Sequence, residues 1–446
     1  VMKYFQNNID FKNGTGQKLY ESAKTMIPGG TQLLSKRPEM FAPQIWPAYY
    51  SKSKGSKVWD LDGNKYIDMS IMGIGANILG YADKDVDKAV ISSIKKGVSS
   101  SLNCPEEVEL AKILTDLHPW AKKVRYARSG GEAMALAVRI ARANTDRDIV
   151  LFSGYHGWED WYLSSNIGNN SALDGQLMDG LNPSGVPRSL KGTSLPFFLD
   201  DIDDFYKNFK GLENKIAAII IEPARGNEAP KELLNKLKKI SNDIGSVLIF
   251  DEITSGFRMC PGGIHLKYGI NPDIAVFAKS IANGYAMSVV IGTEKVMSSA
   301  EATFISSTNW TERIGPTAAI ATINKYIKKD VASHIIKIGQ KTQNIWQEKS
   351  DKYHLDLKVS GIATLGAMAF PGIHSQLLNT FFVVEMLKLG FLGFRQFKPS
   401  YAHSNKDLNL YADAVDIVFE KIAKSAPEDL LTSPVAHSGF FRLTKE

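Results

Sequence analysis

Residues 247–285 read VLIFDEITSGFRMCPGGIHLKYGINPDIAVFAKSIANGY and contain two short apolar runs. The first run, residues 247–250, ends at Asp251, and the second, residues 274–278, ends at Lys279. Short apolar runs bounded by polar and glycine-rich sequence are typical of buried strands in a parallel sheet. Ligands of open α/β sheets bind at the carboxyl edge of the strands, so Asp251 and Lys279 are candidates for a ligand site.

Lys279 has a chemical reason to be singled out. A lysine that emerges from an apolar strand is partly desolvated, and desolvation lowers the pKa of an ammonium group. The neutral amine is the form that attacks a carbonyl group. Taken alone, each residue has a simpler explanation: Lys279 as a lysine that extends to solvent along apolar surface, and Asp251 as a helix cap.

The segments FDEITSGFR and PDIAVFAKSIANGY together resemble the class III family of pyridoxal-phosphate (PLP) enzymes. The branch of glutamate-1-semialdehyde aminomutase and similar aminotransferases is the most similar. The resemblance implies that Lys279 forms the internal aldimine with PLP and that Asp251 holds its pyridinium nitrogen. The chemistry agrees, because PLP accepts electrons only while its ring nitrogen is protonated, and a buried carboxylate maintains that state.

A second motif lies upstream, in VRYARSGGEAMALAVRIARANT, residues 124–145. Ser129, Gly130 and Gly131 precede a predicted helix from Glu132, and such a turn lets backbone N–H groups approach an anion. The predicted helix has an apolar face made of Ala133, Leu136, Ala137, Ile140 and Ala141. The resemblance implies that the turn holds the PLP phosphate. Many relatives have Ser or Thr where this chain has Gly131, so one side-chain contact to the phosphate is missing here.

The segment IVLFSGYHGW, residues 149–158, is a predicted strand that runs into a glycine-rich turn. An ordinary aromatic turn would explain Tyr155 and His156 equally well, but the resemblance implies that this turn places an aromatic ring against the pyridine face. Residues 163–195 follow without sustained periodicity. Long loops inside compact domains are usually functional or disordered, so we expect this loop to cover the mouth of the active site.

The same family resemblance implies three more residues near the cofactor. The apolar run 216–221 ends at Glu222, and the resemblance implies that this acid lies close to cofactor and substrate. It also implies that Asn227 reaches the ring hydroxyl and that Ile253 contacts the cofactor. The predicted site then draws on several strand ends of one sheet.

The segment TFISSTNWT, residues 303–311, bears on the oligomer. The resemblance implies that Thr308 reaches the phosphate of a neighbouring subunit. The active sites would then lie at the subunit interface of a homodimer. The alternative is a Ser/Thr-rich loop in which Thr308 caps a turn of its own subunit.

The expected fold is the α/β fold of the fold-type I PLP-dependent transferases. It has a large, mostly parallel sheet domain and a smaller C-terminal α+β domain. We assign residues 66–328 to the large domain and residues 329–446 to the small one. Residues 1–65 form an N-terminal arm that packs with the small domain. A length of 446 residues suits two or three domains.

The composition excludes several classes of protein. Hydrophobic content is 44% and charged content 22%, which is ordinary for a soluble protein. The net charge is +6 with scattered Lys and Arg, so we expect no nucleic-acid partner. The only cysteines, Cys104 and Cys260, are far apart, which predicts no disulfide, no metal site and a reducing cytoplasm. We expect neither a signal peptide nor a membrane span of roughly 20 apolar residues.

The predicted function is transfer of an amino group between a small amine or amino acid and a carbonyl compound. An intramolecular aminomutase uses the same cofactor residues and remains the main alternative. A non-catalytic PLP-fold binding protein is a third reading, and the intact pair of Asp251 and Lys279 argues against it. Relatives hold a substrate carboxylate with a basic residue of the N-terminal arm, and Lys36 or Arg37 could serve. The sequence around them departs from the aminomutase pattern PGGxxxPxR.

Overall fold

A computed structural model of the chain describes residues 13–440. The chain divides into two compact units. Residues 84–332 form the first, which we call the large unit. The residues up to Asp83 and those from Ser333 form the second, the small unit.

The large unit is built on a seven-stranded sheet of order β4-β10-β9-β8-β7-β5-β6. Its strands are β4 (Lys123–Ala127), β5 (Ile149–Ser153), β6 (Ser194–Pro196), β7 (Ile216–Ile221), β8 (Val247–Asp251), β9 (Ile274–Phe277) and β10 (Ser288–Gly292). The strands from β9 to β6 pair in parallel, and β10 is antiparallel to both its neighbours. Every residue of β7, β8 and β9 is buried, as expected for strands covered on both faces. The predicted mostly parallel sheet is therefore confirmed.

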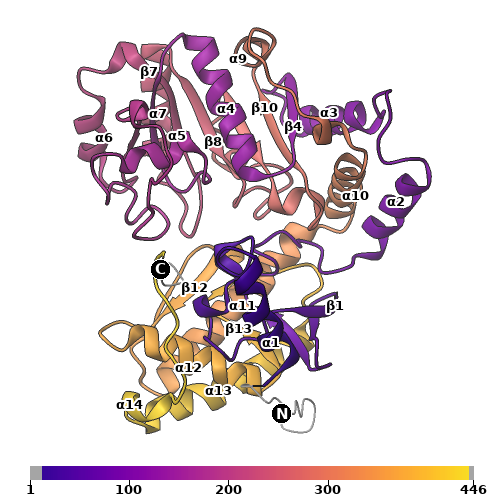
Figure 1. Ribbon diagram of the computed structural model, residues 1–446, viewed down its shortest axis with the longest axis vertical. Coiled ribbons are helices and arrows are strands. Elements are labelled where there is room, and N and C mark those ends of the chain that lie inside the picture. The colour runs from indigo at the N-terminus through magenta and orange to yellow at the C-terminus, as the bar shows by residue number, and fades with distance from the viewer. Residues whose placement is uncertain (1–12, 441–446) are drawn as a thin grey trace. The chain divides into compact units, whose positions relative to one another are not determined.

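Helices complete the large unit. They are α2 (Lys84–Lys95), α3 (Glu106–Leu117), α4 (Gly130–Thr145), α5 (Asp160–Leu163), α6 (Ile202–Phe209), α7 (Lys231–Ile244), α8 (His265–Tyr268), α9 (Glu294–Met297) and α10 (Ile314–Lys328). Helix α4 packs against β7, β8, β9 and β10, across one face of the sheet (Figure 1). A capping box of Ser129 and Glu132 begins this helix, and its predicted apolar face is buried, which confirms that prediction.

The small unit contains two sheets and several helices. One sheet has the order β1-β2-β3-β13 and the other β11-β12-β14. The strands are β1 (Tyr50–Lys54), β2 (Lys57–Asp60), β3 (Lys65–Met69), β11 (Lys358–Ser360), β12 (Gly366–Ala369), β13 (Phe391–Gly393) and β14 (Gln396–Phe397). The helices are α1 (Thr15–Met26), α11 (Val331–Lys352, which begins in the large unit), α12 (Ser375–Lys388), α13 (Asn405–Lys424) and α14 (Pro427–Leu430).

The boundary between the units differs from the one drawn on the sequence. Residues 66–83, assigned above to the large domain, belong to the small unit. The physical reason is strand pairing: β3 lies parallel to β13, with Ile67 opposite Phe391. Both side chains are buried in one apolar cluster, so this segment is part of the core of the small unit.

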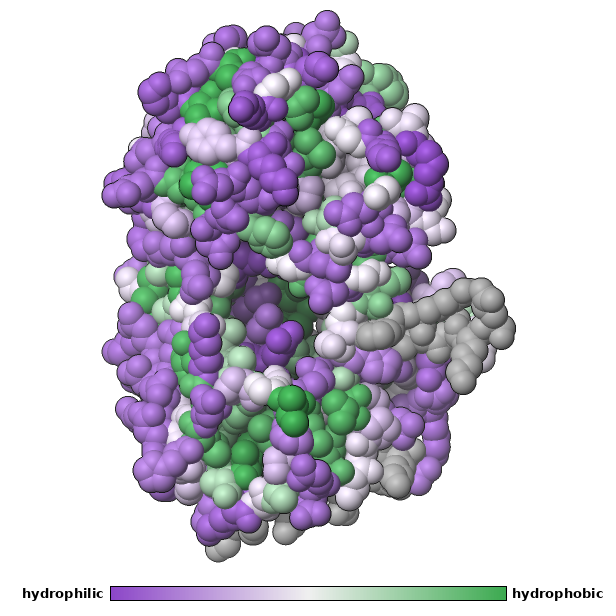
Figure 2. All heavy atoms as spheres, turned by 90° about the vertical axis from the view of Figure 1, so that its left-hand side faces the viewer, coloured by the Kyte–Doolittle hydropathy of each residue, from purple (hydrophilic) through white to green (hydrophobic). Residues whose placement is uncertain are grey.

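On the side of the molecule drawn in Figure 2, the apolar side chains of the described residues gather in small groups among hydrophilic ones. Among residues 13–440, no helix combines the length and the apolar character that crossing a membrane requires.

Candidate active site

The Asp251 carboxylate lies at the end of β8, in a residue that is only 2% exposed. Its Oδ1 accepts a hydrogen bond from the Ile253 backbone N–H at 3.0 Å. Its Oδ2 is 2.7 Å from Nδ1 of His156, whose Nε2 is 3.1 Å from the Ser153 carbonyl oxygen. A carboxylate and a carbonyl only accept, so His156 makes both bonds when each ring nitrogen carries a proton. Burial raises the pKa of Asp251, and the hydrogen bond from His156 opposes this shift.

The two aromatic residues of the turn after β5 have different surroundings. His156 is 1% exposed and is held against Asp251, so it orients that carboxylate. Tyr155 is partly buried, and its backbone N–H donates to Glu222 Oε2 at 2.9 Å. Burial raises the pKa of Tyr155, which keeps its hydroxyl protonated at neutral pH. Of the pair, Tyr155 is the less buried residue.

Lys279 follows β9 and begins a 3₁₀ turn with φ of 45°, in the left-handed region. Strand β9 pairs in parallel with β8, and Val276 of β9 lies opposite Asp251 of β8. Lys279, just after β9, and Asp251 therefore lie at the same edge of the sheet. Nζ of Lys279 donates to Thr254 Oγ1 at 2.8 Å. Burial lowers the pKa of Lys279 to about 8, against the opposing effect of the Glu222 charge. The strand-end position predicts this direction, but the sequence did not reveal Thr254 as the partner.

The glycine turn at the start of α4 has close neighbours on both sides. A Cβ at Gly130 would be 3.1 Å from the Ile253 side chain. A Cβ at Gly131 would be 2.1 Å from Glu159 Oε1, so this glycine makes room for a carboxylate. The Trp158 backbone N–H donates to Glu159 Oε2 at 3.0 Å, whereas buried Oε1 has no hydrogen-bond partner among the described residues. Burial raises the pKa of Glu159.

Glu222 is 6% exposed at the end of β7 and is paired with an arginine that the sequence reasoning missed. Nη1 of Arg225 is 3.0 Å from Glu222 Oε2 and also donates to the Gln176 carbonyl oxygen at 3.2 Å. Gln176 comes from the long loop 163–195, and its side chain binds the Gly154 N–H at 2.7 Å. One signal was available: Arg225 stands between Glu222 and Asn227, which the sequence had already singled out.

Asn227 and Thr308 belong to the large unit, and both are exposed. Thr308 begins the 3₁₀ turn Thr308–Thr311, and its carbonyl oxygen accepts from the Thr311 hydroxyl at 2.8 Å. Its own hydroxyl forms no hydrogen bond with any residue in 13–440, so it does not cap this turn.

The basic residues considered for substrate binding belong to the small unit. Lys36 is exposed on the 3₁₀ turn Leu34–Lys36. Arg37 is partly buried. Its guanidinium packs against Gly29, where an added Cβ would be 2.3 Å from Nη2 of Arg37.

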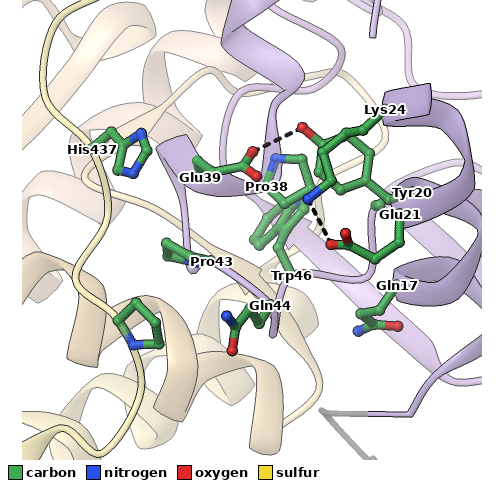
Figure 3. A pocket seen from close by; sticks show the side chains of 12 residues that line it. Gln17, Tyr20, Glu21, Lys24, Pro38, Glu39, Pro43, Gln44, Trp46 and His437 are labelled. Atoms are coloured by element: carbon green, nitrogen blue, oxygen red, sulfur yellow. Dashed lines mark hydrogen bonds and ion pairs between the residues drawn. The ribbon is translucent and has the colours of Figure 1, made fainter. Parts of the chain in front are cut away.

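The small unit also holds a cavity of about 290 Å³, shown in Figure 3. Tyr20 donates to Glu39 beside it at 2.9 Å, and Lys24 pairs with Glu21 at 2.7 Å. None of the predicted site residues lines this cavity, so we do not associate it with the chemistry.

Comparison with known proteins agrees with this architecture. The aminotransferase class-III family model matches residues 41–424. The 3-aminobutyryl-CoA aminotransferase of Cloacimonas acidaminovorans (strain Evry) is 32% identical over 350 residues, which cover 76% of this chain and 80% of the relative. A glutamate-1-semialdehyde 2,1-aminomutase of Thermodesulfovibrio yellowstonii is 30% identical over 434 residues, which cover 92% of this chain and 100% of the relative.

Among solved structures, the FumI protein of Sphingopyxis sp. MTA144 in its PLP internal aldimine form is similar, with a TM-score of 0.85. It is 23% identical, and the match covers 95% of this chain and 99% of that one. This likeness confirms the expected fold of a PLP-dependent transferase. Since the family model spans most of the sequence, the chain belongs to the class III aminotransferases, which are enzymes that use pyridoxal phosphate.

Proposed function

We propose that the chain moves an amino group between two separate small molecules, a donor amine or amino acid and a carbonyl acceptor. The departure of the sequence around Lys36 and Arg37 from the aminomutase pattern PGGxxxPxR favours two separate molecules. One observation carries the amino-transfer chemistry itself. The Lys279 amine, with its pKa lowered to about 8, lies at the same sheet edge as the buried Asp251 carboxylate. When PLP is bound, it supplies an electron sink for the carbon that bears the amine.

The residues of the chain fit that cofactor. Asp251 would hold the proton on its ring nitrogen, and the N–H of His156 orients the carboxylate and favours its ionised form. Tyr155 would pack against the ring face. Lys279, as the neutral amine held by Thr254, would attack the carbonyl carbon of the cofactor. Once free, the same amine would remove a proton from the substrate carbon and return it as a general acid.

The phosphate would bind at the turn from Ser129 to Gly131. The first backbone N–H groups of α4 lack partners within the helix and point towards its N-terminus, where an anion is stabilised. The Glu159 carboxyl group occupies the space where a side chain at Gly131 would stand, beside this turn. Ile253 packs beside Gly130, and exposed Asn227 remains our candidate for the ring hydroxyl.

The experiment that tests this function is a nitrogen crossover. Purified protein with PLP is incubated with ¹⁵N-labelled donors, both amino acids and simple amines, and with unlabelled pyruvate or 2-oxoglutarate. An intermolecular aminotransferase puts ¹⁵N into the acceptor. The relative from Thermodesulfovibrio yellowstonii bears the name of an aminomutase, and that activity would isomerise a single substrate and put no ¹⁵N into a separate oxo acid. Glutamate-1-semialdehyde is therefore included as the discriminating substrate.

We also propose a homodimer in which Thr308 of one subunit reaches the phosphate of the other. Exposed apolar side chains of the large unit support an interface, since Leu102 is 81%, Val108 74% and Phe304 85% exposed. Phe304 stands close in sequence to Thr308, whose hydroxyl is not used within the described chain. A doubly charged phosphate needs several donors, because its desolvation is costly.

If this site is shared, Thr308→Ala should weaken PLP binding and also shift the protein towards monomer at low concentration, because the two equilibria are linked. Sedimentation velocity with and without PLP measures the shift. Ser306→Ala is the matched control, since Ser306 is another exposed hydroxyl of the same segment. Parent-like affinity for PLP in a monomeric Thr308→Ala protein would rule out the shared site.

Finally, we place the protein in the cytoplasm. Cys104 and Cys260 are both free thiols, as expected for a chain kept in a reducing compartment. Oxidation state after isolation from a cell lysate treated with an alkylating reagent tests this placement.

A further inference from the structure

Arg225 lies among the residues proposed for the chemistry but has no role in the mechanism above. Its guanidinium carbon is 5.6 Å from the centre of the Tyr155 ring, and Nη1 is 3.0 Å from Glu222 Oε2. Its charge also acts on Lys279, whose pKa it lowers. The guanidinium therefore lies over the candidate ring-stacking residue, and its charge acts on the candidate amine.

The geometry leaves most of this guanidinium available. Both hydrogen bonds that Arg225 makes with described residues, to Glu222 and to the Gln176 carbonyl, use Nη1. An arginine has five N–H donors, and the Nε and Nη2 edge is the one that binds a carboxylate through two parallel bonds. The side chain is 33% exposed, so a small molecule can reach it.

A second arginine close to Lys279 is less accessible. Arg258 also lowers the pKa of Lys279, but it is only 1% exposed. A bound carboxylate would therefore meet Arg225 and not Arg258. The basic residues Lys36 and Arg37 belong to the small unit, whereas Arg225 is in the same unit as Lys279.

We propose that Arg225 binds the carboxylate of the substrate, so that the donors are amino acids and the acceptors oxo acids, and not simple amines and aldehydes. This inference rests on the proposed function of Lys279. Glu222 and Gln176 hold the guanidinium through Nη1, and the opposite edge receives the carboxylate. In an amino acid that carboxylate lies one or a few carbons from the amine, which brings its charge close to the reacting carbon.

The test uses two small aminooxy reagents that differ in one group. Each would bond to the carbon of bound PLP that carries the Lys279 amine and would release that amine. Aminooxyacetate carries a carboxylate and methoxyamine does not. Their second-order rate constants with the PLP-loaded protein are measured by absorbance, for the parent and for Arg225→Gln. Loss of a charged, two-bond contact should slow aminooxyacetate about 10- to 100-fold, while methoxyamine changes by less than about threefold.

Two variants sharpen the comparison. Arg225→Lys keeps the charge but loses the planar fork, so its rate with aminooxyacetate should fall between the parent and Arg225→Gln. Arg188→Gln removes an exposed arginine of the loop 163–195 and should leave both rates unchanged. With the parent alone, the rate should saturate with aminooxyacetate and stay linear with methoxyamine, so the proposal can fail even if Arg225→Gln does not fold.

Three outcomes would overturn the proposal. Equal slowing of both reagents in Arg225→Gln would mean that Arg225 only positions Glu222. No change in either rate, or linear kinetics with both reagents in the parent, would show that it binds no carboxylate. A parent protein that binds no PLP would instead overturn the proposed function, and this inference with it.

Discussion

A Lys279→Ala variant should lose its borohydride-stable pyridoxyl label and at least about 10³-fold of its turnover, because in the proposed mechanism one amine serves as both nucleophile and general base. Apo-protein is loaded with PLP, treated with sodium borohydride, digested and analysed by mass spectrometry. The parent should carry the label on the peptide that contains Lys279. PLP should still bind to the variant without covalent attachment, since the phosphate turn and Asp251 are intact.

The matched control is Lys239→Ala, which removes an exposed lysine paired with Asp243 on α7. It should keep both label and turnover. A label of parent stoichiometry in Lys279→Ala would contradict the assignment. The pH dependence is a further check, because the neutral amine predominates above its pKa. Attachment of PLP to the parent should speed up with rising pH and level off above about 8. A rate that still rises towards about pH 10 would indicate an ordinary lysine.

The strands and their ends could be predicted from the sequence because a strand that is buried on both faces is a continuous run of apolar residues. The apolar runs before Glu222, Asp251 and Lys279 are fully buried strands, and parallel pairing brings their ends to one edge. The buried face of α4 could be predicted for a similar reason. Apolar residues at helical spacing form one stripe, and that stripe is buried in the structure.

Side-chain partners were harder to predict, because they depend on contacts between residues far apart in the sequence. The hydrogen bond between His156 and Asp251, for example, joins residues that are 95 positions apart in the sequence. The place of a side chain at Gly131 is occupied by Glu159, from another turn. Periodicity carries no information about such pairs. The boundary between the units differs from the one drawn on the sequence for the same reason, because residues 67–69 pair with β13, a strand more than 300 residues further along the chain.

Replacing Asp251 with asparagine should preserve the fold and lower kcat by several decades, on the order of 10³-fold, because an amide cannot balance the charge of a protonated ring nitrogen. The structure explains why folding should survive. In Asp251→Asn, the amide oxygen of the new side chain can still accept from the Ile253 N–H. A neutral His156 can donate from Nε2 to the Ser153 carbonyl and accept the new amide N–H at Nδ1.

Because Asp251→Asn keeps the hydrogen bond to His156, this variant distinguishes a catalytic role of the Asp251 charge from a purely structural role. If Asp251 only anchored His156, Asp251→Asn would keep that anchor and remain active. If the carboxylate holds the ring proton, the variant should bind PLP and form the label on Lys279, yet fail in turnover. Circular dichroism, labelling and kcat are compared in parent, Asp251→Asn and His156→Gln. We expect His156→Gln to lose less activity than Asp251→Asn, because it leaves the negative charge in place. A turnover number for Asp251→Asn within about tenfold of the parent, roughly 1.4 kcal/mol of barrier, would contradict the assignment.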